Sequence, residues 1–299
     1  MAAIGRVTQT MLTDRSLTRL QGSLSRLGEI QEQLSTGRVL NRASDNPADA
    51  SSAMRLRSSI GAQQQYVRNA QDGVGWLDAL DSSLGSAGDL VRRARELGQQ
   101  AISGAAGPEA REALATEIDQ VRKSLVTSAN VRYLDRPVFG GSTTGSAAFT
   151  ESGGTVTFAG DANPVNRAVA DGVLVDVSVA GPVAFGPDGD SVFDHLGALS
   201  AALRAGDLTA VRTGLDALEV DGKRITVARA DVGARTNRVE QAGTRASDAE
   251  LSLTNALSEI ENADLPRTTV ALQMQEVAYQ AALAATSRVL QPSLMDFLR

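Results

Sequence analysis

The sequence has 299 residues, of which 42% are hydrophobic but only 3% are aromatic. This composition is typical of long helices packed in thin layers, because a compact core usually contains more Phe, Tyr and Trp. The chain has no cysteine and a single histidine, His195. Disulfides, thiol catalysis and metal sites built from thiolates or from several histidines are therefore excluded.

The net charge of −6 is carried by one segment of the chain. Residues 140–195 contain seven acidic side chains and one arginine, and the remaining residues are balanced in charge. No basic patch indicates a partner such as nucleic acid or an anionic membrane. We also expect no conventional signal peptide and no transmembrane helix, because the N-terminal residues do not form a leader and no apolar run reaches 18 residues.

The interval before the first proline predicts a long helix over residues 1–36. Its apolar side chains recur at helical spacing. Isolated helices are marginal in water, so we expect this arm to be poorly ordered alone and to become ordered on assembly. The alternative is that it pairs with the C-terminal arm of the same chain as a two-helix coil. The ladder consists of Leu17, Leu20, Leu24, Leu27 and Leu34.

The stretch LSTGRVLNRASDNPADA, residues 34–50, follows this helix. Its polar residues are compatible with a cation loop, a catalytic acidic cluster or a boundary between two helices, and we favour the boundary. Gly37 suits a helix end, and Asn46 suits the N-cap of the next helix. Pro47 then takes the first helical position, and Asp49 the third, where a carboxylate meets free amides and the helix dipole.

Helical spacing returns on both sides of the middle of the chain. Apolar ladders run from Val67 to Leu84 and from Leu114 to Leu125. A longer ladder keeps heptad spacing from Leu208 to Val239, which indicates helix-on-helix packing with coiled-coil character. We interpret these stripes as the core of a helical bundle.

The central segment follows a different pattern. Short β-branched runs such as residues 173–179 alternate with Gly, Pro, Asn and Asp turns, which is a strand-and-turn signature. The sequence therefore predicts an α+β fold, in which a long antiparallel helical bundle or coiled coil made from both termini carries a small inserted β-rich domain. We expect terminal arms at residues 1–44 and 263–299, a helical rod at 45–137 and 190–262, and an outer β-rich domain at 138–189.

The C-terminal arm ends in an apolar patch, whereas chain ends are normally polar. We expect the apolar side chains of both arms to be buried between neighbouring copies and to drive their assembly into rings or helical arrays. The acidic insertion would stay in water. In this arm the predicted interface residues are Val277, Leu283, Leu290, Leu294, Phe297 and Leu298.

Catalytic and cation sites receive little support from the sequence. His195 follows Asp194, and a His–Asp pair can act as a base and its orienting group, but adjacent residues on a helix point in different directions. We expect an ordinary surface histidine. The acids of residues 186–194 do not match the 12-residue calcium loop, and a Pro-Asp-Gly turn explains them. The sequence thus predicts no enzyme, no cofactor and no metal site.

Several stretches resemble one family. The segments EIQEQLSTGRVLNRASDNPADA and NAQDGVGWLDALDSSLGSAGDLVRRARELGQQAISG are similar to the N-terminal region of flagellins. The segments ADVGARTNRVE and ALQMQEVAYQAALAATSRVLQPSLMDFL are similar to the C-terminal region of the same family. Within the family, VFDHLGALSAALRAGDLTAVRTGLDAL and VRYLDRPVFGG look more like the hook–filament junction proteins than like filament flagellins.

The resemblance implies a structural protein that is secreted through the flagellar type III export route and located at the hook–filament junction of a bacterial flagellum. The partners it implies are further copies of the chain, hook-associated protein 1, flagellin and a cytoplasmic export chaperone. The first alternative is flagellin, the filament subunit itself. An intracellular coiled-coil scaffold and an enzyme rank lower.

Overall fold

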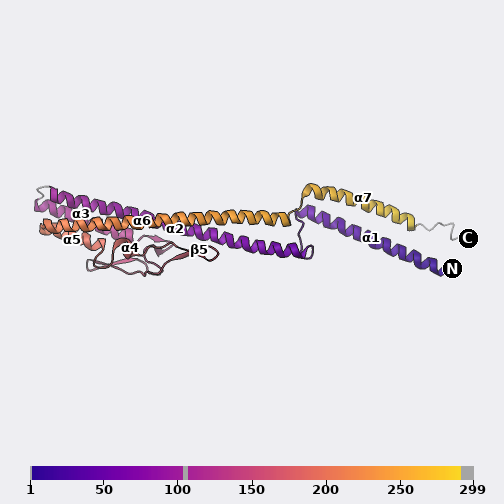
Figure 1. The fold of residues 1–299 in the computed structure, drawn as a ribbon, viewed down its shortest axis with the longest axis horizontal. Coiled ribbons are helices and arrows are strands. Elements are labelled where there is room, and N and C mark those ends of the chain that lie inside the picture. Colours follow the sequence, from indigo (N-terminus) through magenta and orange to yellow (C-terminus); the bar gives the residue numbers. More distant parts are fainter. Residues whose placement is uncertain (1, 104–106, 291–299) are drawn as a thin grey trace. The chain divides into compact units, whose positions relative to one another are not determined.

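A computed structural model describes residues 2–103 and 107–290, which fall into two compact units (Figure 1). Unit 1 combines the residues before Ala62 with those after Glu250, and unit 2 contains Ala62–Glu250. The helices are α1 (Ala2–Thr36), α2 (Pro47–Ser103), α3 (Pro108–Ala129), α4 (Gly181–Phe185), α5 (Val192–Ala205), α6 (Leu208–Glu261) and α7 (Leu265–Leu290). The strands are β1 (Arg132–Tyr133), β2 (Arg136–Pro137), β3 (Phe149–Ser152), β4 (Thr155–Phe158), β5 (Asn166–Ala170) and β6 (Val173–Asp176).

In unit 1 the helices α1 and α7 lie side by side (Figure 1). Gln275 Nε2 of α7 donates hydrogen bonds to the backbone oxygen of Ser23 at 3.1 Å and to its Oγ at 2.9 Å. This is the two-helix pairing within one chain that the sequence left as the alternative to disordered arms. No described side chain of either helix is buried, so the pairing removes little apolar surface from water.

Unit 2 is organised around the antiparallel pair of α2 and α6. Ion pairs connect Asp81 to Arg229 and Arg95 to Glu219, so that position numbers rise on one helix as they fall on the other. The helices α3 and α5 pack on each other beside this pair. The predicted heptad ladder is confirmed from Val211 onward, whereas Leu208, where the prediction began it, is exposed. One residue in each seven of α6 is at most 2% exposed: Val211, Leu218, Ile225, Val232 and Val239.

The inserted region consists of three separate antiparallel hairpins, β1–β2, β3–β4 and β5–β6. The first hairpin lies before residue 138, where the sequence placed the start of the insertion, because helix α3 already ends at Ala129. The core of the insertion is aromatic, and ring centroids lie 5.0 Å apart between Phe139 and Phe185 and 5.1 Å apart between Phe149 and Phe193. Phe193 belongs to α5, so the insertion shares its core with the helices. The predicted fold class, long helices with a small inserted region of short antiparallel strands, is confirmed.

Acidic side chains of the insertion accept hydrogen bonds from its backbone and so stabilise its loops. Hydrogen bonds from the hydroxyl and the backbone N–H of Ser142 hold the pKa of Asp161 below its usual range. Asp188 Oδ1 accepts from the backbone N–H of Phe158 at 2.9 Å. Within residues 2–103 and 107–290, no group of three or more acidic or histidine side chains is arranged to hold a metal ion. In the same residues, no helix combines the length and the apolar character needed to cross a bilayer.

Candidate assembly interface

The segment that joins α1 to α2 in unit 1 contains the residues that the sequence placed at a helix boundary. The helix α1 ends at Thr36, and Gly37 follows with a φ of +69°, a left-handed conformation that favours glycine. The backbone N–H of Gly37 donates to the carbonyl oxygen of Gln33 at 2.9 Å, which closes the last turn. The chain can therefore turn sharply here without strain.

Asn46 lies immediately before α2, where the first helical N–H groups have no partner within the helix. Its Oδ1 accepts hydrogen bonds from the backbone N–H of Ala48 at 3.1 Å and of Asp49 at 3.3 Å. Pro47 is the first residue of α2, where its missing N–H costs nothing. The Asp49 carboxylate accepts from Asn46 Nδ2 at 2.5 Å and lies in the first turn, at the positive end of the helix dipole.

Replacing Asn46 by alanine should weaken the start of α2 by about 0.5–2 kcal/mol, because two helical N–H groups lose their acceptor. Amide exchange in the first two turns of α2 measures this loss. Aspartate at the same position keeps an oxygen acceptor and should restore protection, which makes Asn46→Asp the matched control. Unchanged exchange in the alanine variant would show that the helix start does not depend on Asn46.

A buried ion pair in unit 1 ties the same segment to the end of α6. Glu261 is the last residue of α6, and its side chain is only 6% exposed. Its carboxylate lies 2.7 Å from Arg57 Nη2 and 3.8 Å from Arg38 Nη1. The backbone adds two hydrogen bonds of 2.8 Å, from Val39 N–H to the oxygen of Glu261 and from Ala263 N–H to the oxygen of Gly37. We call these contacts the clasp, and they hold the segment after α1 against the segment before α7.

The predicted leucine ladder of α1 divides between two sides of the helix. Leu20, Leu27 and Leu34 are half-buried at heptad spacing, on the side of Ser23 that contacts α7. Leu17 and Leu24, also seven residues apart, are 47% and 52% exposed. The structure therefore brings part of the predicted interface against α7 within one chain and leaves the rest open to solvent.

The apolar side chains of α7 are more open still. Val277 is 66% exposed and Leu283 is 44% exposed. Val270 and Met274, which we did not include in the predicted interface, are 56% and 70% exposed. Their spacing of four and then three residues to Val277 puts them on one stripe of the helix, and helical spacing was the signal that could have found them. The side chain of Leu290 and all of Leu294, Phe297 and Leu298 lie outside the described residues.

His195 is not the ordinary surface histidine that the sequence predicted. Its Nδ1 lies 2.7 Å from the Asp221 carboxylate, whose side chain is 1% exposed, and its Nε2 lies 3.1 Å from Asp190. Burial raises the pKa of Asp221, while the contacts with His195 and Arg224 act in the opposite direction. Asp194, the neighbour considered as its partner, instead closes a capping box with Ser191 at the start of α5. The group fixes α5 to α6 and includes no nucleophile.

Two protein-family models match this chain. The model of the bacterial flagellin N-terminal helical region matches residues 7–142, and that of the C-terminal helical region matches residues 215–298. The two matches cover most of α1, all of α2 and α3, most of α6 and all of α7. The chain belongs to the flagellin family. The resemblance seen in the sequence motifs is confirmed, and membership makes the chain a structural protein rather than an enzyme.

Curated relatives within the flagellin family include both filament and hook-associated proteins. The chain is 27% identical to flagellin FlaB2 of Treponema pallidum over 276 residues, covering 90% of this chain and 91% of the relative. It is 25% identical to flagellar hook-associated protein 3 of Escherichia coli over 303 residues, covering 91% and 92%. Sequence identity therefore does not separate the two kinds of flagellin-family protein.

Solved structures with a similar fold include two flagellar proteins. FlgL of Bacillus cereus is 26% identical, with a TM-score of 0.60 over 68% of this chain and 99% of the solved chain. A flagellar hook-associated protein of Vibrio parahaemolyticus is 21% identical, with a TM-score of 0.68 over 73% of this chain and all of the solved chain. At that lower identity the Vibrio likeness speaks for the fold alone.

Proposed function

We propose that this flagellin-family chain is the hook–filament junction subunit of a bacterial flagellum, equivalent to hook-associated protein 3. The observation that carries the proposal is the likeness to FlgL of Bacillus cereus, which extends over 99% of that solved chain. The full-length similarity to hook-associated protein 3 of Escherichia coli supports it. The motifs at residues 131–141 and 192–218, which look more like junction proteins than filament flagellins, support it independently.

The structure offers a physical route to assembly through the two arms. Leu17 and Leu24 on α1, and the stripe of Val270, Met274 and Val277 on α7, are exposed apolar side chains in unit 1. Covering them with the arms of neighbouring copies would remove their surface from water, at about 25 cal/mol per Å². The clasp around Glu261 would keep the two arms together while this happens. The chain itself is thus the first partner of the proposal.

The remaining partners follow from the position of a junction subunit. One end of its ring or helical array would contact hook-associated protein 1, and the other would contact flagellin. Before export, a cytoplasmic chaperone would hold the chain. The subunit would then be secreted and remain at the hook–filament boundary.

A second candidate function is the filament subunit itself. The similarity to flagellin FlaB2 of Treponema pallidum, which covers 91% of that relative, favours it. The two functions differ in where the chain lies along the flagellum, since a filament subunit forms the whole filament and a junction subunit only its base.

Imaging separates the two candidates. Because the chain has no cysteine, Lys123→Cys on the exposed side of α3 can carry one maleimide dye. This variant would replace the native copy in the bacterium of origin, with the cysteine-free chain as the labelling control. We expect a single labelled spot at the boundary between hook and filament. Label along the whole filament would assign the chain to the filament and overturn the proposal.

A further inference from the structure

The turn between β1 and β2 exposes two residues in an unfavourable backbone conformation. Leu134 and Asp135 have φ of +44° and +62°, and they are the only residues other than glycine with positive φ in the described part of the chain. Two-residue turns of this hand normally contain Asn-Gly, because a Cβ is disfavoured there. Backbone strain of this kind concentrates at functional positions.

The turn also places an apolar and an acidic side chain in solvent. Leu134 is 74% exposed, and the Asp135 side chain is 98% exposed. The nearest cation to the Asp135 carboxylate is Arg132, at a loose 3.9 Å. A leucine gains nothing from this position within its own chain. We call Leu134 and Asp135 the knob.

A groove runs along α6 in unit 2, between this helix and the insertion. Three hollows form one continuous depression, because the middle one shares Arg238 with the hollow on one side and Asp231 and Arg235 with the hollow on the other. Seven large hydrophobic side chains of unit 2 are exposed, and five of them line this depression. Such a concentration of apolar surface marks an interaction site. The five are Val173, Leu174, Val183, Val220 and Val227.

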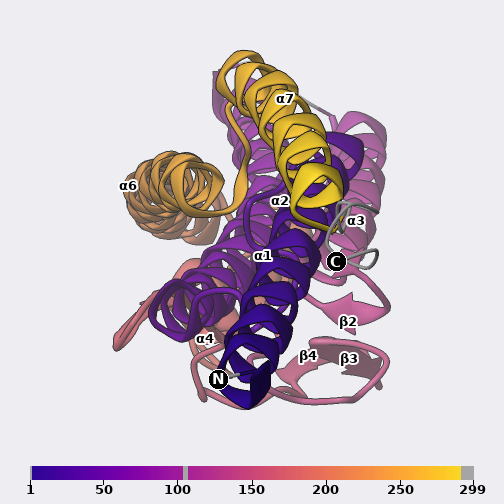
Figure 2. The ribbon, with the colours of Figure 1, turned by 90° about the vertical axis from the view of Figure 1, so that its right-hand side faces the viewer.

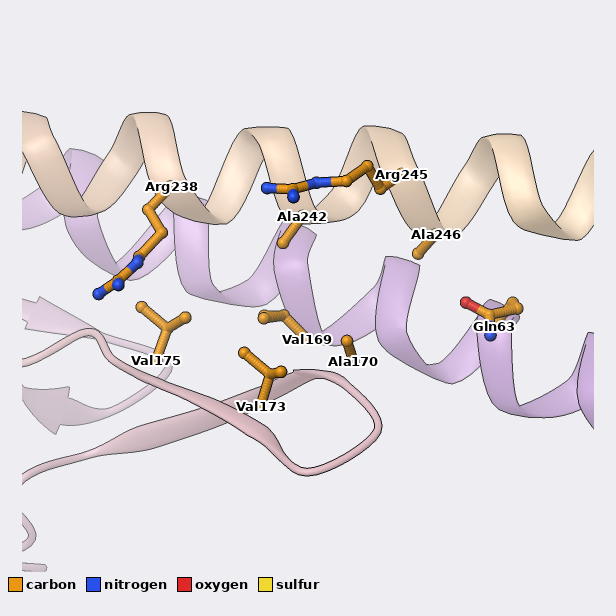
Figure 3. A pocket seen from close by; sticks show the side chains of 9 residues that line it. All are labelled: Gln63, Val169, Ala170, Val173, Val175, Arg238, Ala242, Arg245 and Ala246. Atoms are coloured by element: carbon orange, nitrogen blue, oxygen red, sulfur yellow. The ribbon is translucent and has the colours of Figure 1, made fainter.

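One end of the groove combines an apolar wall with positively charged side chains, which complements the leucine and the carboxylate of the knob. A hollow of about 330 Å³ lies between the β5–β6 hairpin and α6. Figure 3 shows the side chains that line it, of which Val169, Val175 and Ala246 are buried. Arg238 and Arg245 flank it, and both are exposed. The carboxylates of Asp176 and Asp231 pair with Arg235 rather than with these two arginines, and Arg245 Nε donates to the carbonyl oxygen of Gln241 at 3.1 Å. The hollow is therefore apolar with a positive rim.

We propose that the knob of one copy inserts into this hollow of the next copy, with Leu134 against the valines and Asp135 between Arg238 and Arg245. The proposal rests on the proposed function, in which copies of the chain stand side by side. Strand β2, which follows the knob, and helix α6 lie on opposite sides of unit 2 (Figure 2). Two different surfaces of the same chain therefore meet, which is the heterologous contact that builds rings and helical arrays.

The knob and the hollow lie at similar positions along the axis of α2, which allows a lateral contact between neighbouring copies. On α2, Gly75 packs against Tyr133, the residue before the knob, and Gly73 packs against Val239, the residue after Arg238. The knob and the hollow therefore lie at nearly the same height in unit 2. A neighbouring copy needs little axial shift to bring one against the other.

Restoring the favoured turn separates this role from a structural one. The double variant Leu134→Asn with Asp135→Gly removes the strain, so unit 2 should melt about 2–4 °C higher. The same variant removes the leucine and the carboxylate, so cells that carry it should shed filaments at least tenfold more often than wild type. A rise in melting temperature without any change in filament shedding would overturn the proposal, and so would a fall in melting temperature.

Disulfide crosslinking identifies the partner surface directly. In this cysteine-free chain, Leu134→Cys with Val173→Cys should form disulfides between copies in isolated hook–filament structures and give oligomers larger than dimers. The matched control pairs Leu134→Cys with Asn237→Cys, an exposed position of α6 outside the groove, and should give none. Equal crosslinking in both variants, or none in the first, would overturn the contact. The proposed function is tested separately, because it depends on whether the dye on Lys123→Cys labels the boundary between hook and filament.

Discussion

Replacing Val277 by lysine is expected to release filaments from the hook while unit 2 keeps its wild-type melting temperature. Val277 is 66% exposed on α7, in unit 1, so its replacement costs the isolated chain little. In the assembly it would put an ammonium group into an apolar contact whose loss costs about 1.5–3 kcal/mol. That corresponds to about a tenfold to hundredfold weaker association between copies. Filament shedding and thermal unfolding measure the two effects.

Glu276→Lys provides the control for this first prediction. Glu276 is the adjacent residue of α7 and is exposed, but it lies about 100° away around the helix, off the apolar stripe. The control adds the same side chain to the same turn and should leave attachment close to wild type. If both variants shed filaments equally, charge on α7 and not burial of its apolar stripe controls attachment. If neither does, the stripe lies outside the interface.

Replacing Phe193 by alanine is expected to lower the free energy of unfolding of unit 2 by about 3–5 kcal/mol. Phe193 is fully buried, and its ring centroid lies 5.1 Å from that of Phe149 and 5.6 Å from that of Phe185. Its loss would leave a cavity where the insertion meets α5, and rigid helices on either side limit the collapse that could fill it. Guanidinium unfolding followed by the fluorescence of Trp76, which is buried in the same unit, measures the change.

Val183→Ala is the matched control for this second prediction, because Val183 also belongs to the insertion but is 62% exposed. Its replacement should change the free energy of unfolding by less than about 0.5 kcal/mol. A loss below about 1 kcal/mol for Phe193→Ala would mean that the aromatic cluster is not the core of the insertion. The prediction for Val277 would be unaffected, because that residue lies in the other unit.

Regular periodicity made the helical part of the fold predictable. The heptad spacing from Val211 to Val239 places one residue per two turns on the same face, and that face is the buried one. Glycine and proline marked the insertion for a similar local reason, because they favour turns. These are signals within a few residues of each other, which a single sequence displays.

Contacts between distant positions were not predictable in this way. Glu261 shows no local feature that selects Arg57 as its partner, since their pairing depends on the antiparallel return of the chain. His195 likewise finds Asp221 on another helix, while its sequence neighbour Asp194 is occupied at a helix cap. Low aromatic content suggested thin layers throughout, yet the phenylalanines of the described residues gather in one cluster. Amino-acid composition gives the number of aromatic residues but not their positions in the fold.

The joint between the arm and α2 was the most informative short stretch. Its polar residues are compatible with a cation loop or a catalytic cluster, but a helix boundary is the interpretation that the sequence favours. In the structure Asp45 accepts hydrogen bonds from the backbone N–H of Asn41 and Arg42, and Asp49 accepts from Asn46, so the carboxylates hold the loop together. What the stretch did not reveal is the clasp, in which the backbone N–H of Val39 donates to the carbonyl oxygen of Glu261 and the Glu261 carboxylate pairs with Arg57.

Hydrogen exchange of the two arms tests most directly the central claim that assembly supplies the burial they lack. The measurement compares α1 and α7 in the dilute chain and in isolated hook–filament structures, with α6 of unit 2 as the internal reference. We predict fast exchange of both arms in the dilute chain, because no described side chain in them is buried, and strong protection after assembly. Protection of the arms in the dilute chain that equals that of Val211–Val239 would contradict the account.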